Sequence, residues 1–374
     1  MNSTLDDYRV KLVIAVCIVI IGGFIILSFI ITPPTILAGE RRVPARLPPI
    51  SISHIVTAEY MAGLENYIAD SFPFRENLRT LRAITTFYTL QQTDKDGLYF
   101  NRGGAGAFQK VNIEAYEKIA DIILSIAEDL EDQSVYYTFI PDKSFYETRY
   151  YPGFDASLAE DVLSYRLGIN NYTYIDLQSS VNTKSFYRTD LHWNQVEISE
   201  VLVELGKAMG FNIELESYTK EYAGDFIGGF GGQLALPIGN DNLYYLSNQN
   251  LSAYYLDELS MEFLPGLVYD HEKLNGIDPY DFFLSGIQPI VILDNKDNHS
   301  GRHLYVFRDS FTSSLAPLLA SAYSKVYLID LRCIDLWRLN QLVDFIPDSD
   351  VLFIYGTRSL NNPDSLLVSA NSSR

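Results

Sequence analysis

The sequence predicts a membrane-tethered α/β domain whose mostly parallel sheet is covered by helices on both faces. Three observations predict this fold. An unbroken apolar run of 20 residues, Leu12 to Ile31, is long enough to cross a bilayer as a helix. Later in the chain, short continuous apolar runs alternate with helical patterns, which is typical of a parallel sheet. Finally, 374 residues with a 47% hydrophobic fraction are enough to bury a substantial core.

The N-terminal apolar run predicts where the protein resides. We expect residues 1–32 to form a single-pass anchor in the cell membrane, because the run is longer than the apolar region of a cleaved signal peptide. Arg9 and Lys11 precede the run, and three arginines follow it within residues 41–46. Positive charges on both sides mean that the positive-inside rule does not fix its orientation.

A proline-rich segment follows the anchor. Residues 33–56 contain five prolines and predict an extended stalk, so we expect the folded domain to occupy residues 57–374. Helical spacing from Thr57 to Gln92 is broken by "SFPFRENL", where Ser71 is the expected cap of a second helix. A third helix is predicted over residues 111–130.

The rest of the chain contains the expected sheet. The predicted strands are residues 135–141, 172–177, 303–310, 325–331 and 351–356, with covering helices over residues 197–210 and 311–323. Open α/β sheets bind ligands at the carboxyl ends of their strands. The chemically active residues expected there are Asp142, Lys143, Asp309, Ser310, Asp330 and Arg332.

Charge and residue composition restrict which partners and cofactors we expect the protein to bind. The net charge of −19 repels nucleic acid, so no nucleic-acid partner is expected. Cys17 lies in the apolar run and Cys333 is the second cysteine, and neither belongs to a Cys/His cluster. We therefore expect no disulfide, metal site or cofactor. The 27 tyrosines could stack on sugar rings or serve only in packing, and the composition leaves both open.

Ser310 stands where a predicted strand meets a predicted helix. One interpretation is an N-cap, in which the hydroxyl accepts a bond from a backbone N–H of the helix. The other is a nucleophile, because the amide groups and the dipole at a helix N-terminus suit a developing oxyanion. The local sequence does not decide between these two interpretations.

The segment "FYRTDLHWNQ" supplies a base for such a nucleophile. Residues two apart in an extended segment point to the same side, so Asp190 could orient the imidazole of His192 toward a serine. Alternatively, Asp190 forms an Asx-turn or caps a helix that starts near Asn194, and His192 is partly exposed. Metal binding is a weaker alternative, because one histidine and one aspartate make half a site.

Six segments in order carry a resemblance to a known family. They are "FPFRENL", "GLYF", "PDKSFY", "FYRTDLHWN", "PYDFFLSGIQP" and "RDSFTSSLAPLLASAYSKVYLIDLR". Together they resemble the DHHW protein family over roughly residues 60–355. That family is similar to the SGNH-hydrolase-like proteins that O-acetylate alginate outside the bacterial inner membrane. The resemblance implies a three-layer α/β/α domain of the SGNH-hydrolase-like type.

The resemblance also implies site residues. The Asp-His-His-Trp motif of the family reads Asp190-Leu191-His192-Trp193 here, and the alginate relatives keep only Asp-x-His-Trp. The catalytic pair would then be Asp190 and His192, with Ser310 as the nucleophile.

Two departures from the family pattern concern the oxyanion. Arg308 replaces the glycine of the Gly-Asp-Ser block, and Ile287 replaces a common amide in "SGIQP". The residues expected to bind the oxyanion or the substrate are Phe311, Gly286, Gln288, Arg308 and Trp193.

The resemblance implies an O-acetyltransferase acting on an exported or cell-surface polysaccharide through an acyl-serine. It further implies a polysaccharide acceptor, a multi-span membrane-bound O-acyltransferase as the partner that supplies acetyl groups, and an extracytoplasmic domain. Two alternatives stay open. One is a carbohydrate esterase in which water is the acceptor, and the other is a catalytically silent binding or assembly subunit.

Overall fold

A computed structural model describes residues 2–31, 33–49, 59–128, 130, 132–146, 153–248 and 250–367. The chain forms two compact units. Unit 1 comprises residues 1–92 and 232–237, and unit 2 comprises residues 93–231 and 238–374. The boundary between the units lies after Gln92, whereas the sequence analysis started the domain at residue 57. The two helices between these positions belong with the N-terminal helix because the first of them packs against it.

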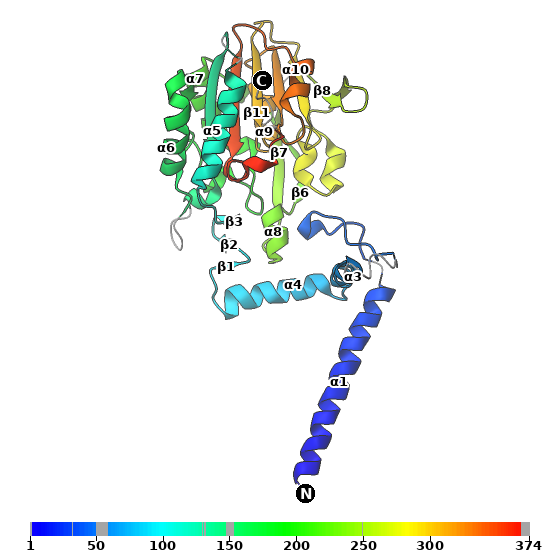
Figure 1. The fold of residues 1–374 in the computed structure, drawn as a ribbon. Coiled ribbons are helices and arrows are strands. Elements are labelled where there is room, and N and C mark those ends of the chain that lie inside the picture. The colour runs from blue at the N-terminus through cyan, green and yellow to red at the C-terminus, as the bar shows by residue number, and fades with distance from the viewer. Residues whose placement is uncertain are drawn as a thin grey trace. The chain divides into compact units, whose positions relative to one another are not determined.

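Unit 1 is built from helices (Figure 1). Its elements are α1 (Asn2–Ile30), the 3-10 turn η1 (Ala38–Glu40), α3 (Glu59–Asp70), α4 (Arg75–Ile84) and the π-turn η2 (Thr85–Thr89). In α1, Tyr8–Ile30 is long and apolar enough to cross a membrane. Two aromatic pairs join α1 to α3 and to the loop after it, with ring centroids 5.8 Å apart for Phe29–Tyr67 and 5.2 Å apart for Phe24–Phe72.

Two expectations for unit 1 were wrong. Ser71 does not cap α4: its N–H donates to the Tyr67 carbonyl and closes α3, and α4 starts after Phe74, which has left-handed backbone geometry. In addition, the described part of the proline-rich segment is not an open stalk. Arg42 makes two hydrogen bonds of 2.7 and 2.6 Å to the Asp70 carboxylate, and Leu37 is buried. An aspartate buried at the end of α3 needs a paired cation, which draws the segment onto the helix.

Unit 2 contains an eight-stranded sheet of order β5-β4-β13-β11-β12-β10-β8-β9. The strands are β4 (Ser134–Ile140), β5 (Thr173–Tyr174), β8 (Leu251–Asp257), β9 (Glu262–Gly266), β10 (Ile290–Asn295), β11 (His303–Arg308), β12 (Lys325–Ile329) and β13 (Asp350–Gly356). The first five strands in this order are parallel, and the last three join antiparallel. This confirms the predicted α/β fold with a mainly parallel sheet.

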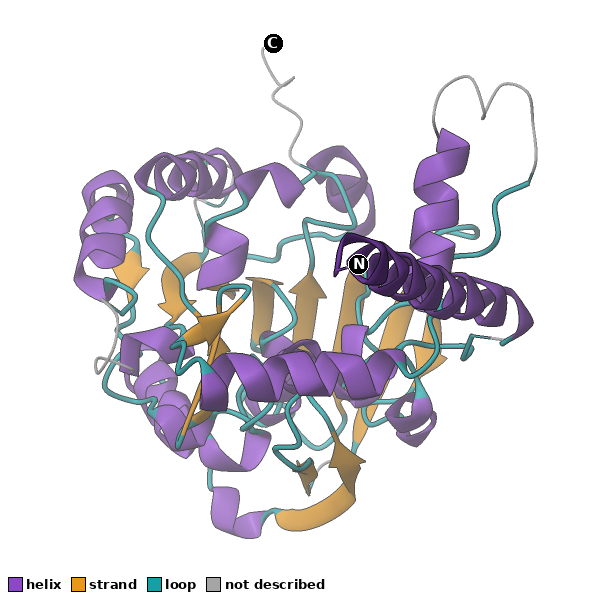
Figure 2. Cartoon of the chain, turned by 90° about the horizontal axis from the view of Figure 1, so that it is seen from below, coloured by secondary structure: helices purple, strands orange, loops and turns teal. Residues whose placement is uncertain are grey.

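Helices cover both faces of this sheet (Figure 2). One core includes apolar side chains of α5 (Ile113–Ala127), α6 (Ala156–Leu167), α10 (Leu336–Leu342) and α11 (Thr357–Leu360). The opposite core includes those of α7 (Ser199–Met209) and α9 (Thr312–Leu319). Asn112 caps α5 by accepting a bond from the Ala115 N–H, and Asp155 caps α6 in the same way.

Smaller elements complete unit 2. The strands β1 (Asp94–Lys95), β2 (Leu98–Asn101) and β3 (Gly104–Ala107) form one antiparallel sheet, and β6 (Thr219–Phe226) pairs with β7 (Asp241–Ser247). The short helix α8 (Gly229–Leu234) lies between β6 and β7 in sequence, and its residues from Gly232 on belong to unit 1. The 3-10 turns are η3 (Lys143–Tyr146), η4 (Gly168–Asn170), η5 (Thr183–Ser185), η6 (Gln195–Glu197), η7 (Leu215–Ser217), η8 (His271–Asn275), η9 (Pro279–Phe282) and η10 (Pro363–Ser365).

The strand β11 positions the candidate nucleophile. It lies between the parallel strands β12 and β13, and all but its first residue are buried. Ser310 follows two residues after its end, and α9 starts at Thr312. Every residue of α9 is buried, so this helix holds the strand-to-helix turn firmly.

Candidate active site

The hydroxyl of Ser310 points to an imidazole. Its Oγ lies 2.8 Å from Nε2 of His192, although the two residues are 118 positions apart in the chain. No side chain caps the start of α9, so the hydroxyl does not serve as the N-cap that the local sequence allowed. It is therefore placed for proton exchange with His192.

Asp190 orients His192 and also forms a turn. Its Oδ1 lies 2.6 Å from Nδ1 of His192 and accepts the backbone N–H of the same residue at 3.0 Å. Its Oδ2 accepts the N–H of Gly229 at 2.8 Å. The Asx-turn and the catalytic interpretation are thus compatible, because one carboxylate serves both. Asp190 and His192 are buried, which shields this contact from water.

A buried lysine supports the loop that carries the pair. Nζ of Lys143, just after β4, donates to the carbonyl oxygens of Ala105, Tyr187 and Asp190 at 2.9, 2.5 and 2.7 Å. Burial lowers the pKa of Lys143 to about 8, while the carboxylate of Asp190 acts in the opposite direction. The sequence analysis placed Lys143 at this end of the sheet, and the structure gives it a supporting role.

A second network fixes the residue before Asp190. The Asp241 carboxylate accepts the N–H and the hydroxyl of Thr189 at 2.7 and 2.5 Å, and the Thr189 hydroxyl accepts the Gly228 N–H at 2.6 Å. A Cβ on Gly228 would lie 2.4 Å from the Cβ of Asp190, so only glycine fits there. Sequence spacing does not identify these residues, because their partners are 39 and 52 positions away in the chain.

Aromatic rings enclose the imidazole. The ring of Tyr280, from η9, is stacked parallel to that of His192, and the Phe311 ring is tilted against it. The Tyr280 hydroxyl donates to Ser314 Oγ on α9 at 2.8 Å. Burial raises the pKa of Tyr280, so the phenol stays protonated at neutral pH. The sequence signal for Tyr280 is its place in the family segment "PYDFFLSGIQP".

Asp309 fixes the nucleophile turn. Its Oδ1 accepts the Phe311 N–H at 3.1 Å, and its Oδ2 accepts the Gly356 N–H at 2.8 Å and the Ser359 hydroxyl at 2.7 Å. The Phe311 amide, predicted as an oxyanion donor, is therefore already engaged. In the part of the chain that the structure describes, the N–H of Ser310 donates to no acceptor, which leaves it as a candidate oxyanion donor.

Two other predicted residues lie beneath this turn. Trp193 is fully buried and donates from Nε1 to the Phe311 carbonyl at 2.8 Å, so it supports the turn from inside. Arg308 is also fully buried, and its Nη1 donates to the Asp309 carbonyl at 3.3 Å and to Ser313 Oγ at 3.1 Å. Burial lowers the pKa of Arg308, and the Asp330 carboxylate acts in the opposite direction.

The remaining predicted residues belong to a loop of their own. Gly286 has a positive φ of 90° and donates to the Phe283 carbonyl at 3.3 Å. Gln288 donates from Nε2 to the Ser285 carbonyl at 3.5 Å. Among the described residues, neither is hydrogen-bonded to Ser310, His192 or Asp190. Beyond β12, Asp330 and Arg332 pair with each other at 2.6 Å and not with the candidate site.

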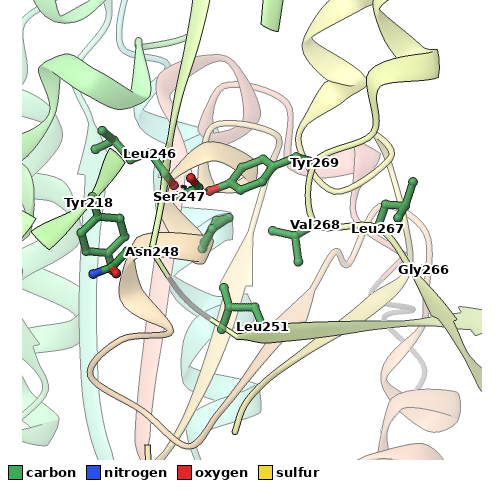
Figure 3. Close-up of a pocket in the computed structure, with 10 residues that line it drawn as sticks. Tyr218, Leu246, Ser247, Asn248, Leu251, Gly266, Leu267, Val268 and Tyr269 are labelled. Atoms are coloured by element: carbon green, nitrogen blue, oxygen red, sulfur yellow. Dashed lines mark hydrogen bonds between the residues drawn. The ribbon is translucent and has the colours of Figure 1, made fainter. Parts of the chain in front are cut away.

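A separate pocket of about 300 Å³ lies against α9 (Figure 3). Its lining includes Tyr218, Leu246, Leu251, Val268, Tyr269 and Pro317. Tyr269 donates from its hydroxyl to the Leu246 carbonyl at 2.9 Å. Ser310, His192 and Asp190 are not among the residues that line this pocket. Across the described residues, no group of three His, Cys, Asp or Glu side chains gathers at either place.

Comparisons with known proteins show which family and which solved structures the chain is similar to. Residues 163–329 match the model of the DHHW protein family, which confirms the resemblance predicted from the sequence. The crystal structure of a DHHW family protein from Eubacterium siraeum has a TM-score of 0.59 at 18% identity, covering 74% of this chain and 97% of its own.

Two further structures are similar to the chain. Bacillus cereus PatB1 with a sulfonyl adduct has a TM-score of 0.55 at 17% identity, covering 70% of this chain and 95% of its own. The O-acetyltransferase domain of Pseudomonas putida AlgJ has a TM-score of 0.42 at 15% identity, covering 71% of this chain and 92% of its own. A search of curated proteins found no match. The likeness to the first two structures shows the fold.

Proposed function

We propose that this protein is an O-acyltransferase that moves acetyl groups to hydroxyl groups of a polysaccharide through an acyl-serine at Ser310. One observation carries the proposal: a continuous hydrogen-bonded series runs from the buried Asp190 and His192 to the half-buried Ser310. A nucleophilic serine needs a base within hydrogen-bond reach and an acceptor that orients this base. Both requirements are met without any movement of the chain.

The first half-reaction forms the ester. Ser310 Oγ attacks the carbonyl carbon of the acyl donor while Nε2 of His192 takes its proton. When the tetrahedral intermediate collapses, the imidazolium returns this proton to the leaving group. Asp190 keeps the Nδ1 proton of the ring directed at its carboxylate, so that Nε2 is the basic nitrogen.

The second half-reaction transfers the acyl group. A sugar hydroxyl gives its proton to Nε2 of His192 and attacks the ester carbonyl, and Ser310 leaves with that same proton. The Ser310 N–H is the proposed oxyanion donor, aided by the positive end of α9. The buried cation of Arg308 adds to this field from beneath the turn.

The location and the partners are part of the proposal. We assign α1 as a single-pass membrane anchor and unit 2 as an extracytoplasmic domain. A multi-span O-acyltransferase in the same membrane would supply acetyl groups, and an exported polysaccharide would accept them. The length and apolarity of Tyr8–Ile30 support the anchor, and the family resemblance supports the partners.

Sulfonyl labelling tests the nucleophile. PatB1, which shares the fold, has been solved with a sulfonyl adduct. An aryl sulfonyl fluoride should therefore modify this chain at one residue, identified by mass spectrometry as Ser310. The Ser310→Ala and His192→Ala variants should resist the reagent, whereas modification of Ser310→Ala at the wild-type rate would disprove the assignment.

Turnover tests the reaction class. The full-length protein should release 4-nitrophenol from 4-nitrophenyl acetate, and Ser310→Ala should fall to the background rate. Adding an oligosaccharide then separates a transferase from an esterase, because only a transferase yields an acetylated sugar.

A catalytically silent subunit is the second candidate. Its support is the engaged Phe311 amide and the arginine at position 308, which together leave fewer oxyanion donors than the family pattern expects. Labelling of Ser310 without any turnover of an activated ester would favour this second candidate.

A further inference from the structure

An exposed apolar stripe runs along α4 and the π-turn that continues it. Phe74, Leu78, Leu81 and Tyr88 are 71, 45, 59 and 63% exposed, and they follow one another at intervals of four, three and seven residues. Leu78 and Leu81 share one face of α4, while Phe74 at its N-cap and Tyr88 in the π-turn extend the exposed apolar residues at its two ends. A continuous exposed apolar face on a helix marks an interaction surface.

The opposite face of α4 is already occupied. Ala83 and Thr86 are buried there. Arg75 pairs with Glu40, and Arg79 lies 3.5 Å from the same carboxylate and donates to the Gly232 carbonyl at 2.9 Å. These contacts, all within unit 1, fix which way the helix is turned. The apolar stripe faces outward as a result.

The start of α4 is held next to the candidate membrane span. The Phe72 ring, two residues before Phe74, stacks on Phe24 of α1. Phe24 precedes the end of the span at Ile30 by six residues, which is about 9 Å of helix. Amphipathic helices on membranes bury their apolar face about 5–10 Å into the boundary between headgroups and acyl chains. The Phe24–Phe72 contact places Phe72 about 9 Å below the end of the span, and this depth falls within the range for amphipathic helices.

We propose that α4 is a second membrane-binding element, which lies in the headgroup region of the bilayer that α1 crosses and inserts its apolar stripe among the lipids. The sequence "RENLRTLRAI" excludes a second span, because three arginines and one glutamate are too costly to place in hydrocarbon. This inference rests on the proposed anchoring by α1 and is independent of the proposed chemistry at Ser310.

Fluorescence quenching in lipid vesicles tests the proposal with the full chain. The protein is reconstituted in phosphatidylcholine vesicles, and one cysteine at a time carries an environment-sensitive probe. In Cys333→Ser the native Cys17, exposed on α1, reports on the span itself. On a background without Cys17 and Cys333, Leu81→Cys reports on the stripe. Glu76→Cys is the matched control, because this side chain is 60% exposed on a different face of α4.

The expected result has three parts. The Cys17 probe is quenched by nitroxides deep in the acyl chains, the Leu81 probe by nitroxides near the headgroups, and the Glu76 probe mainly by aqueous iodide. Quenching of the Leu81 probe by the shallow nitroxide should exceed that of the Glu76 probe several-fold. Circular dichroism and thermal unfolding of each labelled variant confirm that the fold is kept.

Three results would overturn the proposal. A Leu81 probe that iodide quenches as strongly as the Glu76 probe would mean that the stripe faces water. A Leu81 probe shielded from both quenchers would mean that a protein surface or a second copy covers the stripe. If the Cys17 probe is not quenched by lipid, the anchor itself is wrong, and this failure is distinguishable because it appears at α1.

Discussion

The phenol ring of Tyr280 lies parallel to the imidazole ring of His192, with 3.8 Å between ring centroids and 4° between ring planes. A stack of this kind resists rotation of the imidazole, and the bond from the phenol to Ser314 fixes the stack to α9. The helix that follows Ser310 thus also restrains the orientation of His192. Tyr280 acts through His192, so it is a positioning residue.

Replacing Tyr280 separates the roles of its ring and its hydroxyl. We expect Tyr280→Leu to lower kcat about tenfold, because an aromatic stack contributes about 0.5–1.5 kcal/mol beyond burial. Tyr280→Phe keeps the ring and loses only the bond to Ser314, so we expect a smaller loss of kcat than in Tyr280→Leu, with unchanged KM. The measurement is the kcat of ester hydrolysis for both variants. Equal losses of kcat in the two variants would show that the ring stack has no positioning role.

Replacing Asp190 tests the orientation of the imidazole. In Asp190→Asn the side-chain shape is retained, but an amide N–H or a neutral oxygen faces Nδ1 and the active tautomer is lost. We expect kcat to fall about a thousand- to ten-thousand-fold. Sulfonyl labelling of Ser310 should slow in parallel, since both need the same base. A loss below about tenfold would contradict a triad.

A methyl group at Gly228 should disturb the carboxylate of Asp190. Gly228→Ala puts a carbon 2.4 Å from the Cβ of Asp190 and against the Thr189 backbone. We expect a loss of about 1–3 kcal/mol in unfolding free energy together with reduced kcat. Gly168→Ala is the matched control, because nothing lies within 4 Å of the added carbon and φ is −65°. The control should change stability by less than about 0.5 kcal/mol in denaturant titrations.

The buried Lys143 predicts a pH-dependent stability. Burial lowers its pKa in the folded protein to about 8, below the ordinary value of 10.5 in the unfolded chain. Between these values the unfolded state binds more protons, so the contribution of Lys143 to the unfolding free energy increases as pH rises. From pH 8 to pH 10, wild type should gain on the order of 2 kcal/mol relative to Lys143→Met.

Unfolding of the wild type and the Lys143→Met variant in urea at several pH values measures this difference directly. Taking the difference between the two proteins removes the contribution of tyrosines, which titrate in the same range. A difference that stays constant from pH 7 to pH 10 would refute the lowered pKa.

Sequence patterns could predict the strands that are buried on both faces of the sheet. The strands β4, β11, β12 and β13 are continuous apolar runs because helices cover both of their faces. The antiparallel strands β8 and β9 escaped prediction because they are largely half-buried or exposed and carry no continuous apolar run. The cap at Ser71 was wrong because Phe74 takes a left-handed conformation that propensity does not indicate.

The candidate site was only partly predictable. Asp190, His192 and Ser310 were identifiable because their chemistry and a family pattern are local, and the structure brings them together. The contacts of Lys143, Asp241 and Gly228 join segments far apart in the chain, and no spacing rule reports them. The occupied Phe311 amide depends on the rotamer of Asp309, which a sequence does not specify.

The order of strands has a consequence for how the protein is made. The last strand of the chain, β13, lies between β4 and β11. While the polypeptide emerges from its N-terminus, β4 and β11 lack this shared partner strand until residues 350–356 arrive. Contacts of such long sequence separation form late. The sheet that positions Ser310 would therefore stay incomplete in every shorter nascent chain, and a stop codon even shortly before β13 would leave a fragment with unpaired strand edges at β4 and β11.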